Sequence, residues 1–280
     1  MTPFPLDTVQ INAFIDAAFA EDIGTGDVTA SSVIPAAAKL RATMNARESM
    51  VVSGVPLIEP IFRRLDPTVT IELRARDGDH LAAGDTIATI SGEARALLSA
   101  ERTALNILQH LSGIATLTQR YVAAIDGTDA KLLDTRKTIP GLRTLGKYAA
   151  ACGGAHNHRM GLFDAVMIKD NHIAVAGSVT KAVLGAKAAG HTKIQVECDT
   201  LEQVSEAQKA GAASLLLDNM PPEILRQALA IVDGKIPCEA SGGVSLDTIR
   251  AIAETGVNYI SVGRLTQSAP AVDVGLDYSP

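Results

Sequence analysis

The 280-residue sequence contains no tryptophan, 3% aromatic residues and three cysteines. So few aromatic side chains argue against base stacking on nucleic acid, and a net charge of −6 argues against a general polyanion binder. No run of about 18 apolar residues is present, so we expect no membrane-spanning helix. The first ten residues lack a basic segment and an apolar stretch, so we also expect no signal peptide. The cysteines are odd in number and far apart, which favours free thiols in a reducing cytoplasm.

What the chain does contain is a large apolar fraction with unevenly spread charge. It is 47% hydrophobic and 20% charged, which is typical of a folded protein of one large or two modest domains. Residues 131–172 have a net charge of +4, which leaves −10 for the rest of the chain. The charged residues of this segment are Lys131, Asp134, Arg136, Lys137, Arg143, Lys147, Arg159, Asp164, Lys169 and Asp170. A locally basic stretch in an acidic protein indicates a site for a small anion.

The N-terminal part of the chain combines helical and extended patterns. Apolar residues recur at helical spacing over residues 6–20, and extended runs follow at about 40–52 and 69–76. Turn dipeptides at Asp77-Gly78 and Gly84-Asp85 separate further short strands. A long amphipathic helix is predicted over about residues 94–124. We therefore expect a small antiparallel sheet with helices, an α+β unit.

From residue 131 onward, short β-rich runs recur, and most are followed by an alanine-rich helical stretch. The runs are Lys131–Asp134, Ala165–Ile168, Ile194–Glu197, Leu215–Asp218, Pro237–Ala240 and Tyr259–Val262. Strands that alternate with helices at this spacing predict right-handed βαβ units and a parallel sheet. Because eight such units typically need about 250 residues, we expect an incomplete, open α/β barrel. A doubly wound open sheet is the structural alternative.

Polar residues follow each of the six β-rich runs, where a parallel α/β fold builds its site. Arg136, Lys137, Arg159 and Lys169 suit carboxylate or phosphate groups. Two acids, Glu197 and Asp218, suit sugar hydroxyls, Mg²⁺ or a developing positive charge. Two glycine-containing turns, Ser241-Gly242-Gly243 and Val262-Gly263-Arg264, could hold phosphates. These residues predict an enzyme that acts on a phosphorylated sugar and a small anionic co-substrate.

Two other interpretations use features outside that set. His156 and His158, with Glu197 and Asp218, could form a hydrolase metal site, although the cations around them would crowd a dication. The hairpin pattern of residues 77–92 resembles a lipoyl-type module of a non-catalytic binding protein. It lacks a lysine at the hairpin tip, so it has no attachment site.

Eight segments, in order, carry a resemblance to a known family. They are EDIGTGDVT, ERTALNILQHLSGIAT, LDTRKTIPGLR, KYAAACGGAHNHRMGLFDAVMIKDNH, VECDT, LLLDNM, EASGGV and ISVGRLT. With these segments the chain resembles the quinolinate phosphoribosyltransferases over nearly its whole length. The long fourth segment is the most specific, whereas the glycine motifs alone are weak.

The resemblance implies a fold and a reaction. It implies an N-terminal α/β sandwich, placed over residues 1–108, and an open barrel of six to seven strands over residues 109–280, with the C-terminal tail packed back on the sandwich. It also implies transfer of phosphoribosyl from phosphoribosyl pyrophosphate to quinolinate, with decarboxylation, in de novo NAD synthesis. Mg²⁺ is then the expected cofactor, bound mainly through the substrate's pyrophosphate, with Glu197 and Asp218 as candidate protein ligands. A homodimer or larger assembly is expected.

The resemblance also assigns roles to residues. The implied quinolinate site contains Arg102, Thr135, Arg136, His158, Arg159 and Lys169, with Arg102 reaching the partner subunit's site. The implied phosphoribosyl pyrophosphate site contains Lys137, Glu197, Asp218, Ser241, Gly242, Gly243, Val262, Gly263 and Arg264. Lys137, Lys169, Glu197 and Asp218 are the implied catalytic residues. A related phosphoribosyltransferase for nicotinate, or one serving molybdenum uptake, is the nearest alternative. Ala155 departs from the family's frequent glycine there.

Overall fold

The computed structural model describes residues 3–279 and divides the chain into two compact units. The first contains the residues up to Thr118, Pro140–Gly153 and the residues from Ser268 onward. The second contains Gln119–Ile139 and Gly154–Gln267. A continuous helix, α4 (Ala94–Ala124), begins in the first unit and ends in the second. The boundary expected between residues 108 and 109 thus falls inside this helix, and each unit draws on separate stretches of the chain.

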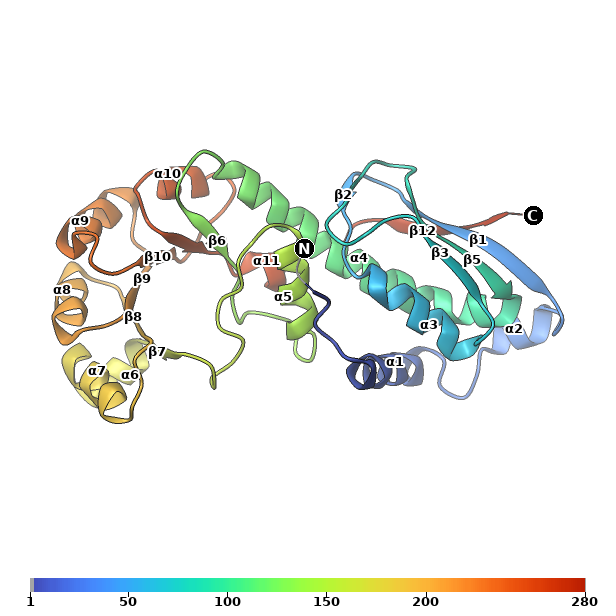
Figure 1. The fold of residues 1–280 in the computed structure, drawn as a ribbon, viewed down its shortest axis with the longest axis horizontal. Coiled ribbons are helices and arrows are strands. Elements are labelled where there is room, and N and C mark those ends of the chain that lie inside the picture. The colour runs from blue at the N-terminus through green and yellow to red at the C-terminus, as the bar shows by residue number, and fades with distance from the viewer. Residues whose placement is uncertain (1–2, 280) are drawn as a thin grey trace. The chain divides into compact units, whose positions relative to one another are not determined.

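The first unit is built on an antiparallel sheet with the strand order β12-β1-β5-β3 (Figure 1). These strands are β12 (Val274–Ser279), β1 (Lys39–Ala46), β5 (Thr86–Glu93) and β3 (Thr70–Leu73). Along β1 the side chains of Ala42, Met44 and Ala46 are fully buried, as the period of two of a half-buried strand requires. Because β12 pairs with β1, the end of the chain returns to the N-terminal sheet.

Helices and a second, small sheet complete the first unit. They are α1 (Thr8–Asp22), α2 (Val28–Val33), the short 3₁₀ turn η1 (Val55–Leu57), α3 (Ile58–Leu65), α5 (Arg143–Cys152) and the pair β2 (Met50–Val51) and β4 (His80–Leu81). Asp7 caps α1 by accepting a hydrogen bond from the backbone N–H of Gln10 at 2.8 Å. A 2.7 Å bond from the Tyr148 hydroxyl to the buried carboxylate of Asp77 ties α5 to this unit. Burial is the main reason that the pKa of Asp77 is raised.

The second unit is an open barrel of six parallel strands in the order β6-β11-β10-β9-β8-β7. They are β6 (Lys131–Leu133), β7 (Val166–Ile168), β8 (Ile194–Cys198), β9 (Ser214–Asp218), β10 (Cys238–Ser241) and β11 (Tyr259–Ser261). Strands that follow one another along the chain are neighbours from β7 to β11, and β6 then pairs with β11. The sheet is therefore open between β6 and β7, which confirms the prediction of an incomplete barrel.

One short interaction partly fills this opening. His156 forms an isolated parallel bridge with Leu133 of β6, with the His156 N–H donating to the Leu132 carbonyl at 2.9 Å. The residues that follow His156 have no regular secondary structure. Side-chain hydrogen bonds must therefore hold this segment, since a strand ladder does not.

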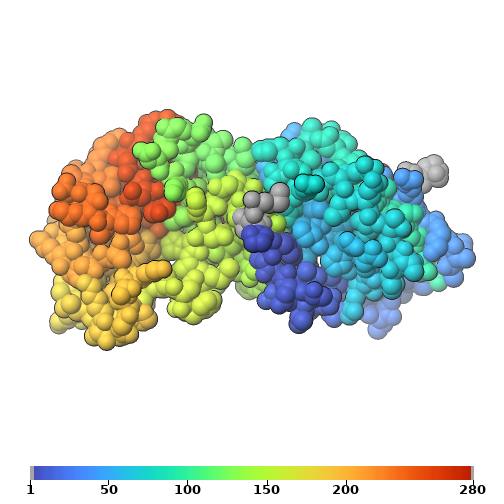
Figure 2. All heavy atoms as spheres, in the orientation of Figure 1, coloured from blue at the N-terminus to red at the C-terminus, as the bar shows by residue number. Residues whose placement is uncertain are grey.

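Helices follow the barrel strands of this unit. They are α6 (Asp170–Ala176), α7 (Val179–Ala188), α8 (Leu201–Ala210), α9 (Pro222–Val232), α10 (Ile249–Ala253) and α11 (Arg264–Gln267). Of these, α7, α8 and α9 lie on the outer side of the sheet (Figure 1). Figure 2 shows α7 to α9, in yellow to orange, as the outer surface of this unit. Within residues 3–279, no helix combines the length and apolar character needed to cross a membrane.

Candidate functional site

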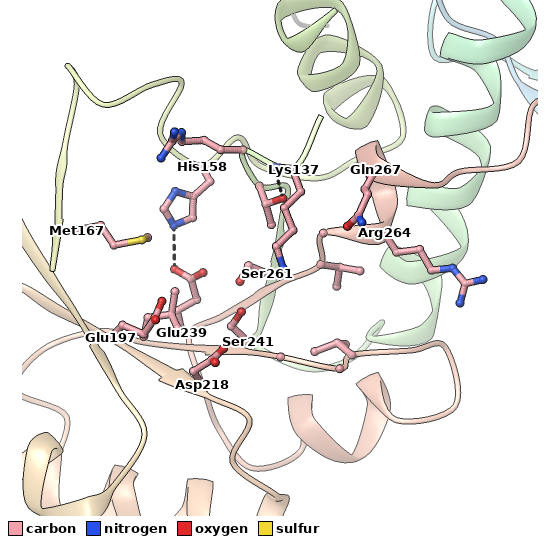
Figure 3. A pocket seen from close by; sticks show the side chains of 18 of the residues that line it. Lys137, His158, Met167, Glu197, Asp218, Glu239, Ser241, Ser261, Arg264 and Gln267 are labelled. Carbon is pink, nitrogen blue, oxygen red and sulfur yellow. Dashed lines mark hydrogen bonds and ion pairs between the residues drawn. The ribbon is translucent and has the colours of Figure 1, made fainter. Parts of the chain in front are cut away.

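A cavity of about 530 Å³ opens at the carboxyl ends of the barrel strands (Figure 3). Except for Arg102, every residue assigned to the site from the sequence lines it. These are Thr135, Arg136, Lys137, His158, Arg159, Lys169, Glu197, Asp218, Ser241, Gly242, Gly243, Val262, Gly263 and Arg264. Arg102 lies exposed on α4 in the first unit. The six polar strand ends thus meet in one place, as the topology of a parallel barrel predicts.

Two partly buried arginines share one side of this cavity. Arg159 donates a hydrogen bond from Nη1 to the Ala165 carbonyl at 2.8 Å, which fixes its guanidinium. Burial lowers the pKa of Arg159, and the nearby positive charge of Arg136 lowers it further. The negative charge of Asp164 partly offsets this effect, and an anion bound beside the two arginines would offset it further.

Hydrogen bonds of its backbone N–H and carbonyl hold Lys137 in position. Its N–H donates to the Thr135 hydroxyl at 3.0 Å, and its carbonyl accepts from the Thr266 hydroxyl at 2.7 Å. The side chain then passes over Gly263, where an added Cβ would lie 2.8 Å from the Lys137 Cδ. Glycine at position 263 leaves room for the lysine stem, and Figure 3 shows the ammonium group directed into the cavity.

The acids of the cavity are engaged by neighbouring groups. Lys169, which follows β7, forms an ion pair with Glu197 on β8, whose side chain is buried. Asp218, at the end of β9, accepts a hydrogen bond at 2.5 Å from the side-chain amide of Asn219. Asn219 has a φ of +53°, a left-handed conformation that asparagine tolerates better than most residues. Its backbone directs the amide back onto Asp218.

The loop after β10 approaches Asn219 closely. Gly242 has a φ of +90°, and a Cβ built there would lie 2.1 Å from the Asn219 side-chain oxygen. The Asn219 N–H also donates to the Ser241 carbonyl at 2.9 Å. Glycine is thus required at position 242 both by its backbone conformation and by the neighbouring strand end. In the second glycine loop, Figure 3 shows the exposed Arg264 side chain directed away from the acids.

His158 contacts a residue that was not assigned to the site from the sequence. Its ring Nε2 lies 3.2 Å from the Glu239 carboxylate, and its Nδ1 accepts the Arg159 N–H at 2.8 Å. Glu239 on β10 is 3% exposed and also accepts from the Gln195 side chain at 2.7 Å. Burial by itself would raise the pKa of Glu239, but hydrogen bonds from His158, Ser261 and Gln195 lower it overall. Glu239 is therefore an ionised acid in the wall of the cavity.

Other lining residues were also missed. They are Met167, Leu216, Val244, Ser261 and Gln267. A usable signal exists for Glu239, because it precedes Ser241 by two residues on β10 and so faces the same side. Gln267 lies on α11 after the second glycine loop and carries no comparable signal.

The structure describes no protein metal centre and no strained backbone at Ala155. Among residues 3–279, no group of three or more His, Cys, Asp or Glu side chains is placed to hold a metal ion. His156 is exposed, and His158 faces Glu239. Asn219 and Asp233 are the non-glycine residues with positive φ in this range, so Ala155 has an ordinary backbone conformation. Alanine therefore fits where the family often has glycine.

Comparison with family models matches both parts of the chain. Residues 27–112 match the model described as the N-terminal domain of quinolinate phosphoribosyl transferase. Residues 114–277 match the model of its C-terminal domain. The two matches meet near the middle of α4 and together span most of the chain.

Comparison with individual known proteins agrees with the family matches. The chain is 44% identical to a Bacillus subtilis (strain 168) protein named "Probable nicotinate-nucleotide pyrophosphorylase (carboxylating)", over 97% of this chain and 94% of that protein. It is 40% identical to a Nicotiana glauca quinolinate phosphoribosyltransferase (decarboxylating), covering 96% of this chain and 82% of that one. The solved nicotinate-nucleotide pyrophosphorylase of Francisella tularensis superimposes with a TM-score of 0.94, with 38% identity and full coverage of both chains.

Proposed function

The chain belongs to the quinolinate phosphoribosyl transferase family, and from this premise we propose that it is the quinolinate phosphoribosyltransferase of de novo NAD synthesis. In this reaction the phosphoribosyl group of phosphoribosyl pyrophosphate passes to quinolinate. The products are nicotinate mononucleotide, pyrophosphate and CO₂. The proposal rests on the site as well as on the family.

The observation that carries the proposal is that two arginines, Arg136 and Arg159, line one cavity. Burial and the positive charge of Arg136 lower the pKa of Arg159, and Asp164 opposes this shift, so a further anion bound beside the two arginines would be stabilised. Quinolinate brings two adjacent carboxylates, and arginine binds carboxylates in a bidentate manner. Lys169 and the Thr135 hydroxyl line the same cavity and complete the proposed quinolinate site.

The other residues of the cavity suit the phosphorylated sugar. The pyridine nitrogen of quinolinate attacks C1′ of the ribose, the bond from C1′ to pyrophosphate breaks, and no general base is needed. Because the transition state resembles an oxocarbenium ion, the carboxylates of Glu197 and Asp218 stabilise the sugar. Lys137 and the two glycine loops bind the phosphates that the sugar carries.

Decarboxylation follows once the ring nitrogen is alkylated. The bond from C2 to its carboxylate breaks, CO₂ leaves, and the electron pair stays at C2 beside the cationic nitrogen until a proton is taken up. A cation next to C2 stabilises this stage. Lys169 and Arg136 are the candidates for that role, since both line the quinolinate side of the cavity.

Mg²⁺ is the cofactor we propose, held mainly by the pyrophosphate of the substrate. Mg²⁺ commonly binds through one or two protein carboxylates together with substrate phosphates, and Glu197 and Asp218 are oxygen donors of that kind. Each already has a protein partner, Lys169 for Glu197 and Asn219 for Asp218. Because both carboxylates already have protein partners, we propose that the Mg²⁺ ion enters the site bound to the substrate's pyrophosphate. When bound, it neutralises the charge of the leaving pyrophosphate.

A homodimer or larger assembly acting in the cytoplasm is the remaining part of the proposal. Cys152, Cys198 and Cys238 are free thiols, in keeping with a reducing compartment. Arg102 would complete the quinolinate site of the partner subunit. Two variants that are inactive alone, Arg102→Ala and Lys137→Ala, test this sharing. Mixed dimers would then regain one intact site, so up to about a quarter of wild-type activity should return after the two are unfolded and refolded together. No recovery would refute the shared site.

The reaction itself is tested by following pyrophosphate and CO₂ release with quinolinate and phosphoribosyl pyrophosphate. Both products should appear in equal amounts, activity should vanish on chelation, and added Mg²⁺ should restore it. Nicotinate in place of quinolinate is the matched substrate control, because it lacks one carboxylate. Pyrophosphate release with nicotinate, but not with quinolinate, would identify a different phosphoribosyltransferase.

A further inference from the structure

We infer that Glu239 is a positioning residue that reaches across the barrel to fix His158, and through it the segment that carries Arg159. The inference rests on the proposed function, because Arg159 is assigned there to quinolinate. Glu239 lies on β10, near the middle of the sheet, whereas His158 lies in the irregular segment beside the opening between β6 and β7. The contact between them therefore joins the two sides of the barrel.

The irregular segment after His156 depends on side chains for its position. The buried Asp134 carboxylate accepts hydrogen bonds at 2.7 Å from the Asn157 amide and from the His158 backbone N–H. These two bonds hold the backbone on the β6 side. The contact of the His158 ring with Glu239 holds the same segment from the opposite side. Because no strand ladder supports it, the segment should loosen when either anchor is removed.

The geometry also determines which nitrogen of His158 carries its proton. The Arg159 N–H donates to Nδ1, so Nδ1 must carry a lone pair. The ring proton of a neutral imidazole then lies on Nε2 and points to the Glu239 carboxylate. Glu239 thus selects the tautomer, and that tautomer accepts the Arg159 N–H. Each ring nitrogen of His158 contacts a neighbouring group, Glu239 or the Arg159 backbone. His158 therefore positions the Arg159 backbone, and its ring forms part of the cavity wall.

A second hydrogen bond helps to hold the Glu239 carboxylate in place. The same oxygen that faces His158 accepts the side-chain amide of Gln195, on β8, at 2.7 Å. The pair also separates two hollows, because Glu239, His158 and Arg159 line both the cavity at the carboxyl ends and another of about 640 Å³. The second hollow is lined by residues that begin or precede strands, among them Lys131, Ser214 and Pro237.

The kinetic test compares Glu239→Ala with Glu239→Gln. Loss of the buried acceptor in E239A should raise the KM for quinolinate by about 10- to 100-fold, as expected when a buried donor loses its partner. The KM for phosphoribosyl pyrophosphate should change by less than about threefold, because the glycine loops do not depend on His158. The E239Q variant keeps an acceptor oxygen and should recover most of the quinolinate KM. An E239A enzyme with an unchanged quinolinate KM, or with both KM values raised equally, would overturn the inference.

The tautomer gives a second readout that does not depend on activity. Histidine labelled with ¹⁵N, with His158→Gln to assign the signal, should show a neutral ring protonated at Nε2 in the wild type. The pattern should persist in E239Q and change in E239A. Glu206→Ala is the matched control, since Glu206 is a partly buried acid that binds Thr180 away from the cavity. A wild-type ring protonated at Nδ1 would refute the positioning role even if E239A did not fold. A wild type that does not turn over quinolinate would instead refute the proposed function.

Discussion

Lys169 and Glu197 form an ion pair that joins the ends of two neighbouring strands, β7 and β8. The Lys169 side chain is 43% exposed and that of Glu197 is 10% exposed, so the pair lies at the edge of the cavity. Lys169 belongs to the proposed quinolinate site, and Glu197 to the proposed phosphoribosyl site. One contact therefore connects the two substrates, and a ligand that draws Lys169 toward its carboxylate frees the Glu197 carboxylate for the sugar.

A double-mutant cycle tests this pair. Lys169→Met, Glu197→Gln and the double variant should show a coupling of about 0.5–1 kcal/mol in the free energy of unfolding measured with urea. The value is modest because water screens the exposed lysine. Each single variant should also lose most of its pyrophosphate release, since each removes one group from the cavity. Additive unfolding energies within the error of the measurement would contradict the pair.

Removal of Arg136 should weaken the binding of quinolinate. The loss of one buried cationic contact to a carboxylate typically costs about 2–5 kcal/mol, so Arg136→Ala should bind quinolinate at least about 30-fold more weakly in calorimetry. Arg250→Ala is the matched control, because Arg250 lies in the same unit, is exposed and pairs with Glu254. If R136A and R250A bind quinolinate equally well, the assignment of the pocket is wrong.

Gly242 should be far less tolerant of alanine than Gly190. Both have a φ near +90°, so alanine at either position carries a backbone penalty of about 1–2 kcal/mol. Nothing lies within 4 Å of a Cβ at position 190, whereas at position 242 it would lie 2.8 Å from the Asn219 backbone nitrogen. G242A should therefore unfold at lower urea than G190A and should raise the KM for phosphoribosyl pyrophosphate, because Asn219 orients Asp218. Equal effects of the two variants would show that only the backbone conformation matters.

Local patterns were enough to predict most of the barrel and most of the residues around its cavity. The six β-rich runs became β6 to β11, because a buried parallel strand has a distinctive apolar composition and a polar end. The convergence of Arg136, Glu197 and Ser241 follows from topology alone, since parallel strands place their carboxyl ends together. The long helix predicted over residues 94–124 is α4, for its amphipathic period continues through Gly113.

Contacts between residues far apart in the sequence could not be predicted in the same way. Helix α5 lies between β6 and β7 in the chain yet belongs to the first unit, held by bonds such as that of Tyr148 to Asp77. Its sequence shows an apolar face but not the partner of that face. The bond between Glu239 and His158 joins residues 81 positions apart, and neither residue type alone indicates it. Such pairings are decided by three-dimensional packing, so the sequence pattern contains no local record of them.

The stability of the first unit should depend on pH through Asp27. Asp27 caps α2 by accepting the Ala30 N–H at 2.8 Å, and it also accepts the Ser99 hydroxyl of α4 at 2.8 Å. The bond from Ala30, followed by that from Ser99, lowers the pKa of Asp27. A carboxyl group with a lowered pKa in the folded state stabilises the protein above its unfolded pKa of about 3.9, and this stabilisation is lost as the pH falls through the folded value.

Asp27→Asn and Asp27→Ala separate the charge of this residue from its capping bond. Asparagine is as good a cap as aspartate, so D27N should lose little at pH 3 and more at pH 7, where the wild-type carboxylate is ionised. Alanine cannot accept the Ala30 N–H, so D27A should lose about 1 kcal/mol at pH 7 from the cap alone. Urea unfolding at both pH values measures these differences. Because the wild type gains stability from Asp27 only when it is ionised, a D27N deficit that grows toward pH 3 would have the wrong sign and would contradict the lowered pKa.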